Sequence, residues 1–183
     1  MKKDILAIFA GVIVVIILIM GTDFQSVEEY YSTHPDYIPK DSKKVTVAIE
    51  CKTLLDNMKN LENGLEKYVP KDGIILEKTE FALNDNDTVF DVLQRATKYK
   101  KIQMEYQGAD LNQYGSVYIE GINHLYEFSC GELSGWVYSV NNKFPSRGCS
   151  SYTLKDGDSI VWQYTCDLGR DVGAEFVEGQ NGR

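Results

Sequence analysis

Aromatic side chains give this chain its clearest binding chemistry. Eight of the 12 tyrosines and both tryptophans lie within residues 99–164. Trp136 and Tyr138 are two residues apart in an alternating segment, so they share one face of a strand, and Tyr118 can face the same way from its own strand. Flat apolar rings that carry a polar atom suit the binding of a small molecule, a sugar or a peptide.

The same aromatic residues could instead fill a small core. We expect core positions for Phe90 and Trp162, whereas both interpretations stay open for Trp136, Tyr138 and Phe144. Polar loops on the C-terminal side of this strand, at 141–143 and 146–148, are places where specificity contacts often lie.

Other side chains offer less chemistry. The run 84–87 and four aspartates (Asp156, Asp158, Asp167 and Asp171) could supply oxygen ligands to calcium, but neither group has the spacing of an EF-hand loop. Caps and turns explain both groups, and a weak calcium site stays open. With only two histidines, His34 and His124, no catalytic triad or His-rich centre can be assembled. We predict a binding protein that requires no cofactor, not an enzyme.

The four cysteines are Cys51, Cys130, Cys149 and Cys166, and no two have C-x-x-C spacing. The sequence therefore gives no support for a zinc ribbon or a thioredoxin-type redox site. An even number favours disulfides in a chain that leaves the cytosol, with three possible pairings; four buried free thiols are the alternative.

The N-terminal segment bears on location. Residues 5–20 contain no charged or polar side chain and would span roughly 24 Å as a helix. We predict an uncleaved signal-anchor at 1–21, with a cleaved signal peptide or a core helix as alternatives. Lys2 and Lys3 would keep the N-terminus in the cytoplasm, which places the rest of the chain outside the cell membrane.

Composition defines the rest of the organisation. We expect a polar stalk at 22–43, one domain at 44–169 and a flexible tail at 170–183. The net charge of -8 repels phosphate backbones, so a nucleic-acid partner is not expected.

The elements that must position the aromatic residues follow from periodicity. Alternation predicts strands at 45–51, 73–76, 79–83, 102–106, 116–119 and 136–140, and a final hairpin of 152–154 with 159–164. Capping boxes at Thr53 and Thr88 predict two helices, the first continuing through Leu65 and the second with Val89, Val92, Leu93, Ala96 and Tyr99 on one face. The fold class is therefore α+β, a β-grasp-like mixed sheet with two helices packed on one face, preceded by one N-terminal transmembrane helix.

Four segments carry a resemblance: DTVFDVLQRA at 87–96, YGSVYIEGI at 114–122, SGWVYSVNNKFPSRGCSSY at 134–152 and LKDGDSIVWQYT at 154–165. With them, the chain resembles the bacterial family of transcobalamin-like domains, which are related to the C-terminal domain of transcobalamin and intrinsic factor. The resemblance implies a small β-grasp-type domain. In the animal carriers this domain closes over cobalamin opposite a large helical domain, which we do not find in these 183 residues.

The resemblance also implies cysteine pairs and a ligand. With the first and last long strands side by side, the expected disulfides are Cys51–Cys166 and Cys130–Cys149. The implied function is a membrane-anchored extracytoplasmic module that binds cobalamin or another corrinoid, or captures it for a transporter. The alternative is a surface adhesion or assembly module for a protein or polysaccharide. The expected ligand-binding residues are Trp136, Tyr138, Tyr118, Phe144, Asn141 and Tyr114.

Overall fold

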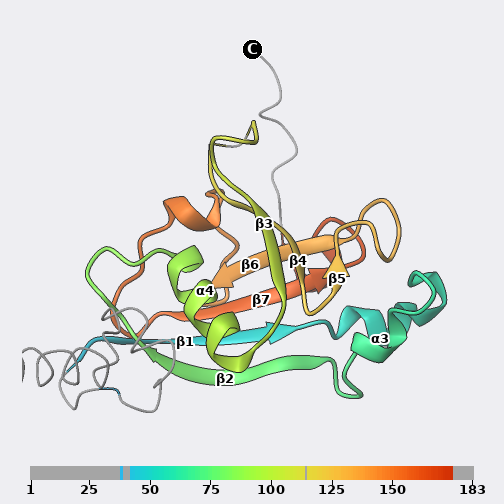
Figure 1. The fold of residues 1–183 in the computed structure, drawn as a ribbon, viewed down its shortest axis with the longest axis horizontal. Coiled ribbons are helices and arrows are strands. Elements are labelled where there is room, and N and C mark those ends of the chain that lie inside the picture. The colour runs from blue at the N-terminus through green and yellow to red at the C-terminus, as the bar shows by residue number, and fades with distance from the viewer. Residues whose placement is uncertain (1–37, 39–41, 114, 175–183) are drawn as a thin grey trace, which may run out of the picture. The chain divides into compact units, whose positions relative to one another are not determined.

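A four-stranded mixed sheet forms the centre of the domain (Figure 1). The computed structural model describes residues 38, 42–113 and 115–174. The strands lie in the order β2 (Ile74–Ala82), β1 (Lys44–Glu50), β7 (Ser159–Thr165) and β6 (Gly135–Val140). β1 and β7 are parallel, whereas β1–β2 and β6–β7 are antiparallel. The mixed sheet is thus confirmed, with the first and last long strands adjacent.

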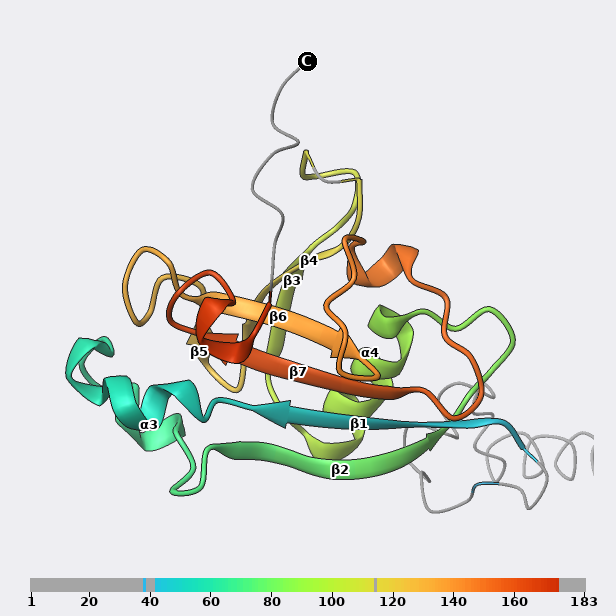
Figure 2. The same cartoon turned by 180° about the vertical axis from the view of Figure 1, so that it is seen from behind.

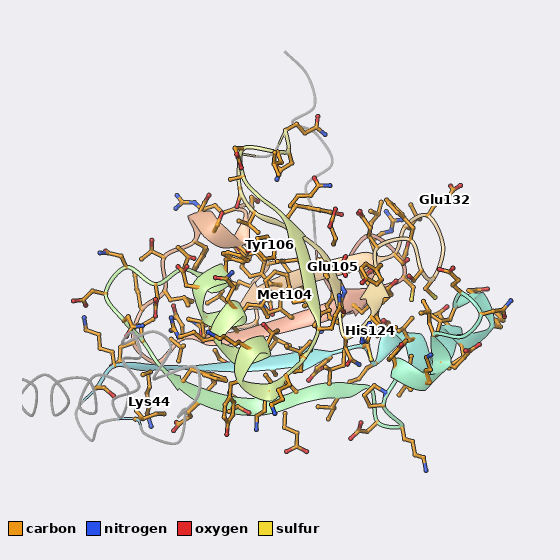
Figure 3. The ribbon with its side chains drawn as sticks, in the orientation of Figure 1. Lys44, Met104, Glu105, Tyr106, His124 and Glu132 are labelled. Carbon is orange, nitrogen blue, oxygen red and sulfur yellow. The ribbon has the colours of Figure 1, made fainter. Side chains whose placement is uncertain are left out.

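A second, smaller sheet was not predicted. It has the order β3 (Met104–Gln107), β4 (Tyr118–Ile122) and β5 (Leu125–Tyr126), so the strands form two sheets rather than one. β3 packs on the helix before it: the Tyr106 ring lies edge-on to Phe90 at 4.8 Å, and Met104 is partly buried against the core (Figure 3).

Helix α4 (Val89–Lys100) confirms the second predicted helix. Thr88 and Asp91 form the capping box, in which each side chain accepts a hydrogen bond from the other residue's backbone N–H. The expected apolar face is buried against β1 and β7 at Val89, Val92, Leu93 and Ala96. This cluster is the main core, and it includes Trp162, as expected; Phe90 is partly buried against it.

The first predicted helix is much shorter than expected. α3 covers only Thr53–Asn57 and continues from the end of β1, as both views show (Figures 1 and 2). It passes into the 3₁₀ turns η1 (Met58–Asn60) and η2 (Glu66–Tyr68). The predicted capping box is wrong, because the Thr53 hydroxyl donates to the Tyr164 carbonyl instead, at 2.5 Å. Leu54 and Leu61 pack with Tyr164 in a second cluster at this end of the sheet.

The predicted final hairpin is also wrong. Thr153 bridges Thr88, and β7 pairs with β6 and β1 rather than with 152–154. The turn before β7 is as expected, with Gly157 at φ +83°. Two further 3₁₀ turns are η3 (Cys149–Ser151) and η4 (Arg170–Val172). Ala174, beyond η4, is buried, so ordered structure continues past residue 169, the expected end of the domain.

The predicted anchor at 1–21 lies outside the described residues. Within the described ranges, no helix is long and apolar enough to span a membrane.

Candidate functional site

A cavity of about 1160 Å³ lies at the edge of the central sheet, beside β6. Its volume slightly exceeds the range of about 300–1,000 Å³ that is usual for small-molecule sites. Most of its wall is apolar, formed by Val117, Leu133, Trp136, Val137, Leu168 and Ala174.

Strand β6 supplies one wall because it is the last strand of its sheet. Gly135, at the start of β6, lines the cavity without a side chain. Trp136 also lines it, and its indole N–H donates to the Leu125 carbonyl at 2.8 Å. The Trp136 ring also lies edge-on to Tyr164, with ring centres 5.3 Å apart. The indole is therefore fixed between the core and the cavity.

The segment after β7 supplies the opposite wall. The Asp171 carboxylate accepts hydrogen bonds from the Thr165 hydroxyl and, at 2.7 Å, from the Cys166 N–H. Leu168 adopts φ +48°, and its N–H donates to the Leu133 carbonyl at 2.8 Å. This bond brings together two leucines that are 51% and 42% exposed, so an apolar rim borders the cavity.

A loop and the start of β4 complete the cavity. The Ser116 and Ser150 hydroxyls are 2.8 Å apart, and the Val117 N–H donates to the Ser150 hydroxyl at 2.9 Å. Gly148 packs so closely on Ser116 that a Cβ there would lie 2.0 Å from its hydroxyl oxygen. These contacts hold Arg147, the residue before Gly148, beside the cavity.

Two arginines make the cavity unusual in an acidic protein. Arg170 forms two hydrogen bonds to the Asp167 carboxylate, at 2.6 and 3.1 Å, and thereby lowers the pKa of that carboxyl group. The Arg147 side chain is exposed and forms no ion pair or hydrogen bond within the described part of the chain. An unpaired guanidinium over an apolar wall can receive an anionic group from a ligand.

The predicted ligand-binding residues are not all at this cavity. Tyr118 and Trp136 line it, and the Tyr118 hydroxyl donates to Glu127. Tyr138 is 9% exposed and packs between Trp162 and Tyr152, and its hydroxyl donates to the Arg147 carbonyl at 2.6 Å. Burial raises the pKa of Tyr138.

The remaining predicted residues lie elsewhere or outside the described ranges. The Asn141 amide donates to Asp158 at 2.8 Å and accepts from the Ser159 N–H at 3.0 Å, so it ties a turn together. Phe144 is half-buried and does not line the cavity, and Tyr114 lies outside the described residues.

Sequence reasoning missed Arg170, Leu133 and Leu168 as cavity residues. The loop 146–148, which the sequence marks as a place for specificity contacts, does contribute Arg147 to the cavity. Four segments distant in sequence meet here, and no local pattern reports that meeting.

The acidic clusters serve turns and ion pairs. Asp87 binds Arg95, Asp158 accepts from the Lys155 N–H, and Asp156 accepts from the Lys44 N–H. Across residues 42–113 and 115–174, no group of three or more His, Cys, Asp and Glu side chains could hold a metal ion. His124 stacks on Tyr68 at 4.3 Å, in the β4–β5 turn (Figure 3).

The expected disulfides are absent, since all four cysteines are free thiols. The Cys130–Cys149 prediction fails on geometry: Cys149 belongs to the main core, whereas Cys130 belongs to the cluster around Tyr164. Cys51 and Cys166 do share this second cluster, but the sulfur beside Cys166 is that of Cys130, at 3.4 Å.

Comparisons with known proteins give a partial match. Residues 86–166, less than half of the chain, match a family described as a domain of unknown function (DUF4430). No curated protein matches the sequence.

Among solved structures, haptocorrin in complex with Cbi is similar with 12% identity and a TM-score of 0.47 over 72% of this chain. The similarity spans only 27% of the haptocorrin chain. A proposed metal-binding protein from Ruminococcus gnavus ATCC 29149 has 14% identity and a TM-score of 0.42, over 67% of this chain and 96% of its own.

Proposed function

We propose that the chain is a membrane-anchored extracytoplasmic module that binds a large ligand with an apolar face and an anionic group. The cavity beside β6 carries the proposal, because its wall is largely apolar and Arg147 beside it has no partner among the described residues. The overall charge of -8 makes this local positive charge a selective feature.

Cobalamin is the first ligand to test. The sequence resemblance at 87–96, 114–122, 134–152 and 154–165 motivates it, and its chemistry suits the cavity. A corrin ring has flat apolar surface for the Trp136 and Leu168 side of the cavity, and the phosphodiester of cobalamin offers Arg147 a charge partner. We propose binding, and capture for a transporter, rather than catalysis.

The charge contact can be tested with two ligands that differ at the phosphodiester. Titration of the full-length protein, followed by corrinoid absorbance, compares cobalamin with cobinamide, which lacks the nucleotide and its phosphate. We expect Arg147→Gln to weaken cobalamin binding about tenfold, the scale of one charged hydrogen bond, and to leave cobinamide binding unchanged. Lys143→Gln removes the same charge from an exposed residue outside the cavity and should change neither affinity.

The apolar wall needs its own variant. Leu133→Asp places a charge in the rim of the cavity, and we expect it to weaken both corrinoids. Leu111→Asp is the matched control, because Leu111 is 74% exposed and does not line the cavity. A folded protein that binds neither corrinoid at millimolar concentration would refute the corrinoid proposal.

A specific observation favours a second candidate, an extended peptide. The Asn141 backbone N–H donates to the Ser159 carbonyl, at the end of the β6–β7 ladder. In an antiparallel pair, only every second residue bonds to the partner strand, so the backbone N–H and carbonyl of Trp136 point away from β7. The Trp136 N–H and carbonyl have no partner within the described residues. A strand added at this edge would use them, which suits the adhesion or assembly alternative.

Peptide arrays would test this second candidate. N-methylation of alternate residues in a bound peptide removes the N–H groups that a strand pair needs. Binding that survives methylation in both alternating sets would exclude strand addition.

The location can be tested independently of the ligand. We propose that residues 1–21 anchor the chain with the domain outside. Full-length protein should sediment with membranes and lose its domain to protease added to intact cells; a protease-protected domain would contradict the orientation.

A further inference from the structure

We infer that Cys130 and Cys166 form a disulfide when the chain meets a disulfide oxidant, and that this bond joins two walls of the cavity beside β6. The two sulfur atoms are 3.4 Å apart, and both residues are free thiols. Cys130 lies in the β5–β6 loop, whose Glu132 is labelled in Figure 3, and Cys166 directly follows β7.

The backbone on both sides is already held in place. The Cys166 N–H donates to the Asp171 carboxylate at 2.7 Å, and the Cys130 N–H donates to the Ser134 hydroxyl at 3.0 Å. That hydroxyl lies 3.1 Å from the Tyr164 hydroxyl, which binds the loop to β7. Formation of the Cys130–Cys166 disulfide therefore requires mainly a rotation of the two side chains, and the backbone loses little additional conformational freedom.

The other two thiols are poorly placed to compete. The Cys149 sulfur lies 3.3 Å from the Val117 carbonyl oxygen, in the main core. Cys51 is completely buried, whereas Cys166 is partly exposed and can be reached by an oxidant. Cys166 is thus the thiol that reacts first.

The reaction balances as two exchange steps with oxidised glutathione. The Cys166 thiolate attacks one glutathione sulfur, which forms a mixed disulfide and breaks the glutathione S–S bond, releasing one glutathione thiolate. The Cys130 thiolate then attacks the Cys166 sulfur and releases the second glutathione. The protein pair loses two protons and two electrons, and oxidised glutathione is reduced to two glutathione thiols.

Burial and the neighbouring Cys130 raise the pKa of Cys166 to about 12. The thiolate is therefore scarce in the folded protein near pH 7, and oxidation should accelerate about tenfold for each unit of pH toward that value.

The bond would act on the cavity through its two exposed leucines. Leu133 is three residues after Cys130, and Leu168 is two residues after Cys166, on the two segments that the bond would join. This consequence rests on the proposed function, because it assumes that the cavity binds a ligand. The disulfide itself does not depend on that assumption.

Peptide mapping tests the bond directly. Full-length protein, purified with its thiols reduced, is incubated with oxidised glutathione at pH 9, alkylated and digested with trypsin. Each cysteine lies on a different tryptic peptide, since cleavage after Lys and Arg gives 45–52, 102–143, 148–155 and 156–170. We expect 102–143 linked to 156–170, with 45–52 and 148–155 alkylated.

Several outcomes would overturn the inference: a link to 45–52 or 148–155, a lasting glutathione adduct on 156–170, or four alkylated peptides. Cys149→Ser should retain the link, and Cys166→Ser should lose it. The oxidised wild type should melt on the order of 10 °C above the reduced form, because the bond closes a long loop, and this difference should vanish in Cys166→Ser.

A ligand measurement separates the bond from its consequence. We expect oxidised protein to release cobalamin more slowly than reduced protein, since the two leucines are held together. A mapped disulfide with equal release rates would refute the effect on the cavity alone. A mapped disulfide in a protein that binds no corrinoid would instead refute the proposed corrinoid function and leave the bond established.

Discussion

Arg95→Met tests how much of the fold depends on one buried ion pair. Arg95 is 4% exposed and Asp87 is 8% exposed. The guanidinium donates two hydrogen bonds to the Asp87 carboxylate, at 3.0 and 2.5 Å, and a third to the Ala82 carbonyl at 3.0 Å. The pair thus connects the end of β2, the turn before α4 and α4 itself.

The expected effect is large because methionine leaves a buried carboxylate and a carbonyl without their partner. Breaking a buried pair in this way costs about 3–5 kcal/mol. With a slope of about 2 kcal/mol per molar urea, the midpoint of unfolding should fall by roughly 2 M. Urea denaturation of the full-length chain can be followed by tryptophan fluorescence, since both tryptophans lie in the described domain.

Two further variants make the measurement decisive. Lys44→Met breaks an exposed pair with Glu80, in which both side chains are 51% exposed, and should cost less than about 1 kcal/mol. Arg95→Met combined with Asp87→Asn should recover part of the loss, because the buried charge is gone while the Asn84 N–H keeps an acceptor. A loss in Arg95→Met no greater than in Lys44→Met would refute the assigned role of the pair.

Three other perturbations follow from the structure. Thr88→Ala removes the capping-box acceptor of the Asp91 N–H and should lower the free energy of unfolding by about 1 kcal/mol, measured by urea denaturation. Burial raises the pKa of Cys51 from 9.0 to about 12, so the unfolded chain loses that proton first and stability should fall as pH rises from 9 to 12; Cys51→Ala should make the fall shallower. Gly148→Ala should lower the free energy of unfolding by about 1–3 kcal/mol, because the new Cβ would lie 2.0 Å from the Ser116 hydroxyl oxygen. The backbone itself would tolerate alanine, since φ at this glycine is -65°. Adding Ser116→Gly should therefore restore part of the stability.

The elements with complete local signals were predictable. α4 has its capping box and its buried face within residues 88–100, so neighbouring residues in sequence suffice to define it. The helix expected after Thr53 had a similar pattern, but Gly64 adopts φ +91° within it and the Thr53 hydroxyl serves β7 instead of a cap. Tertiary contacts overrode the local pattern there.

The order of the strands predicts only part of the cysteine arrangement. β1 and β7 are parallel neighbours, as expected, and Cys51 and Cys166 do lie in one cluster. The prediction did not include the fold of the β5–β6 loop, whose hydrogen bonds to Ser134 bring Cys130 against Cys166. A loop that folds back on itself and packs against the end of β7 leaves no periodic signal in the sequence.

Trp136 and Tyr138 show why the cavity itself could not be predicted. Both are on the same face of β6, as alternation requires, yet only Trp136 lines the cavity. Tyr138 lies opposite Trp162 in the middle of the sheet and is enclosed by Tyr152, so its ring belongs to the core. Trp136 is opposite Tyr164, near the start of β6, where the Gly135 position has no side chain and the segment after β7 lines the cavity. Binding surface and core thus divide along the length of the strand rather than between its two faces, and a pattern with a period of two residues carries no information about position along the strand.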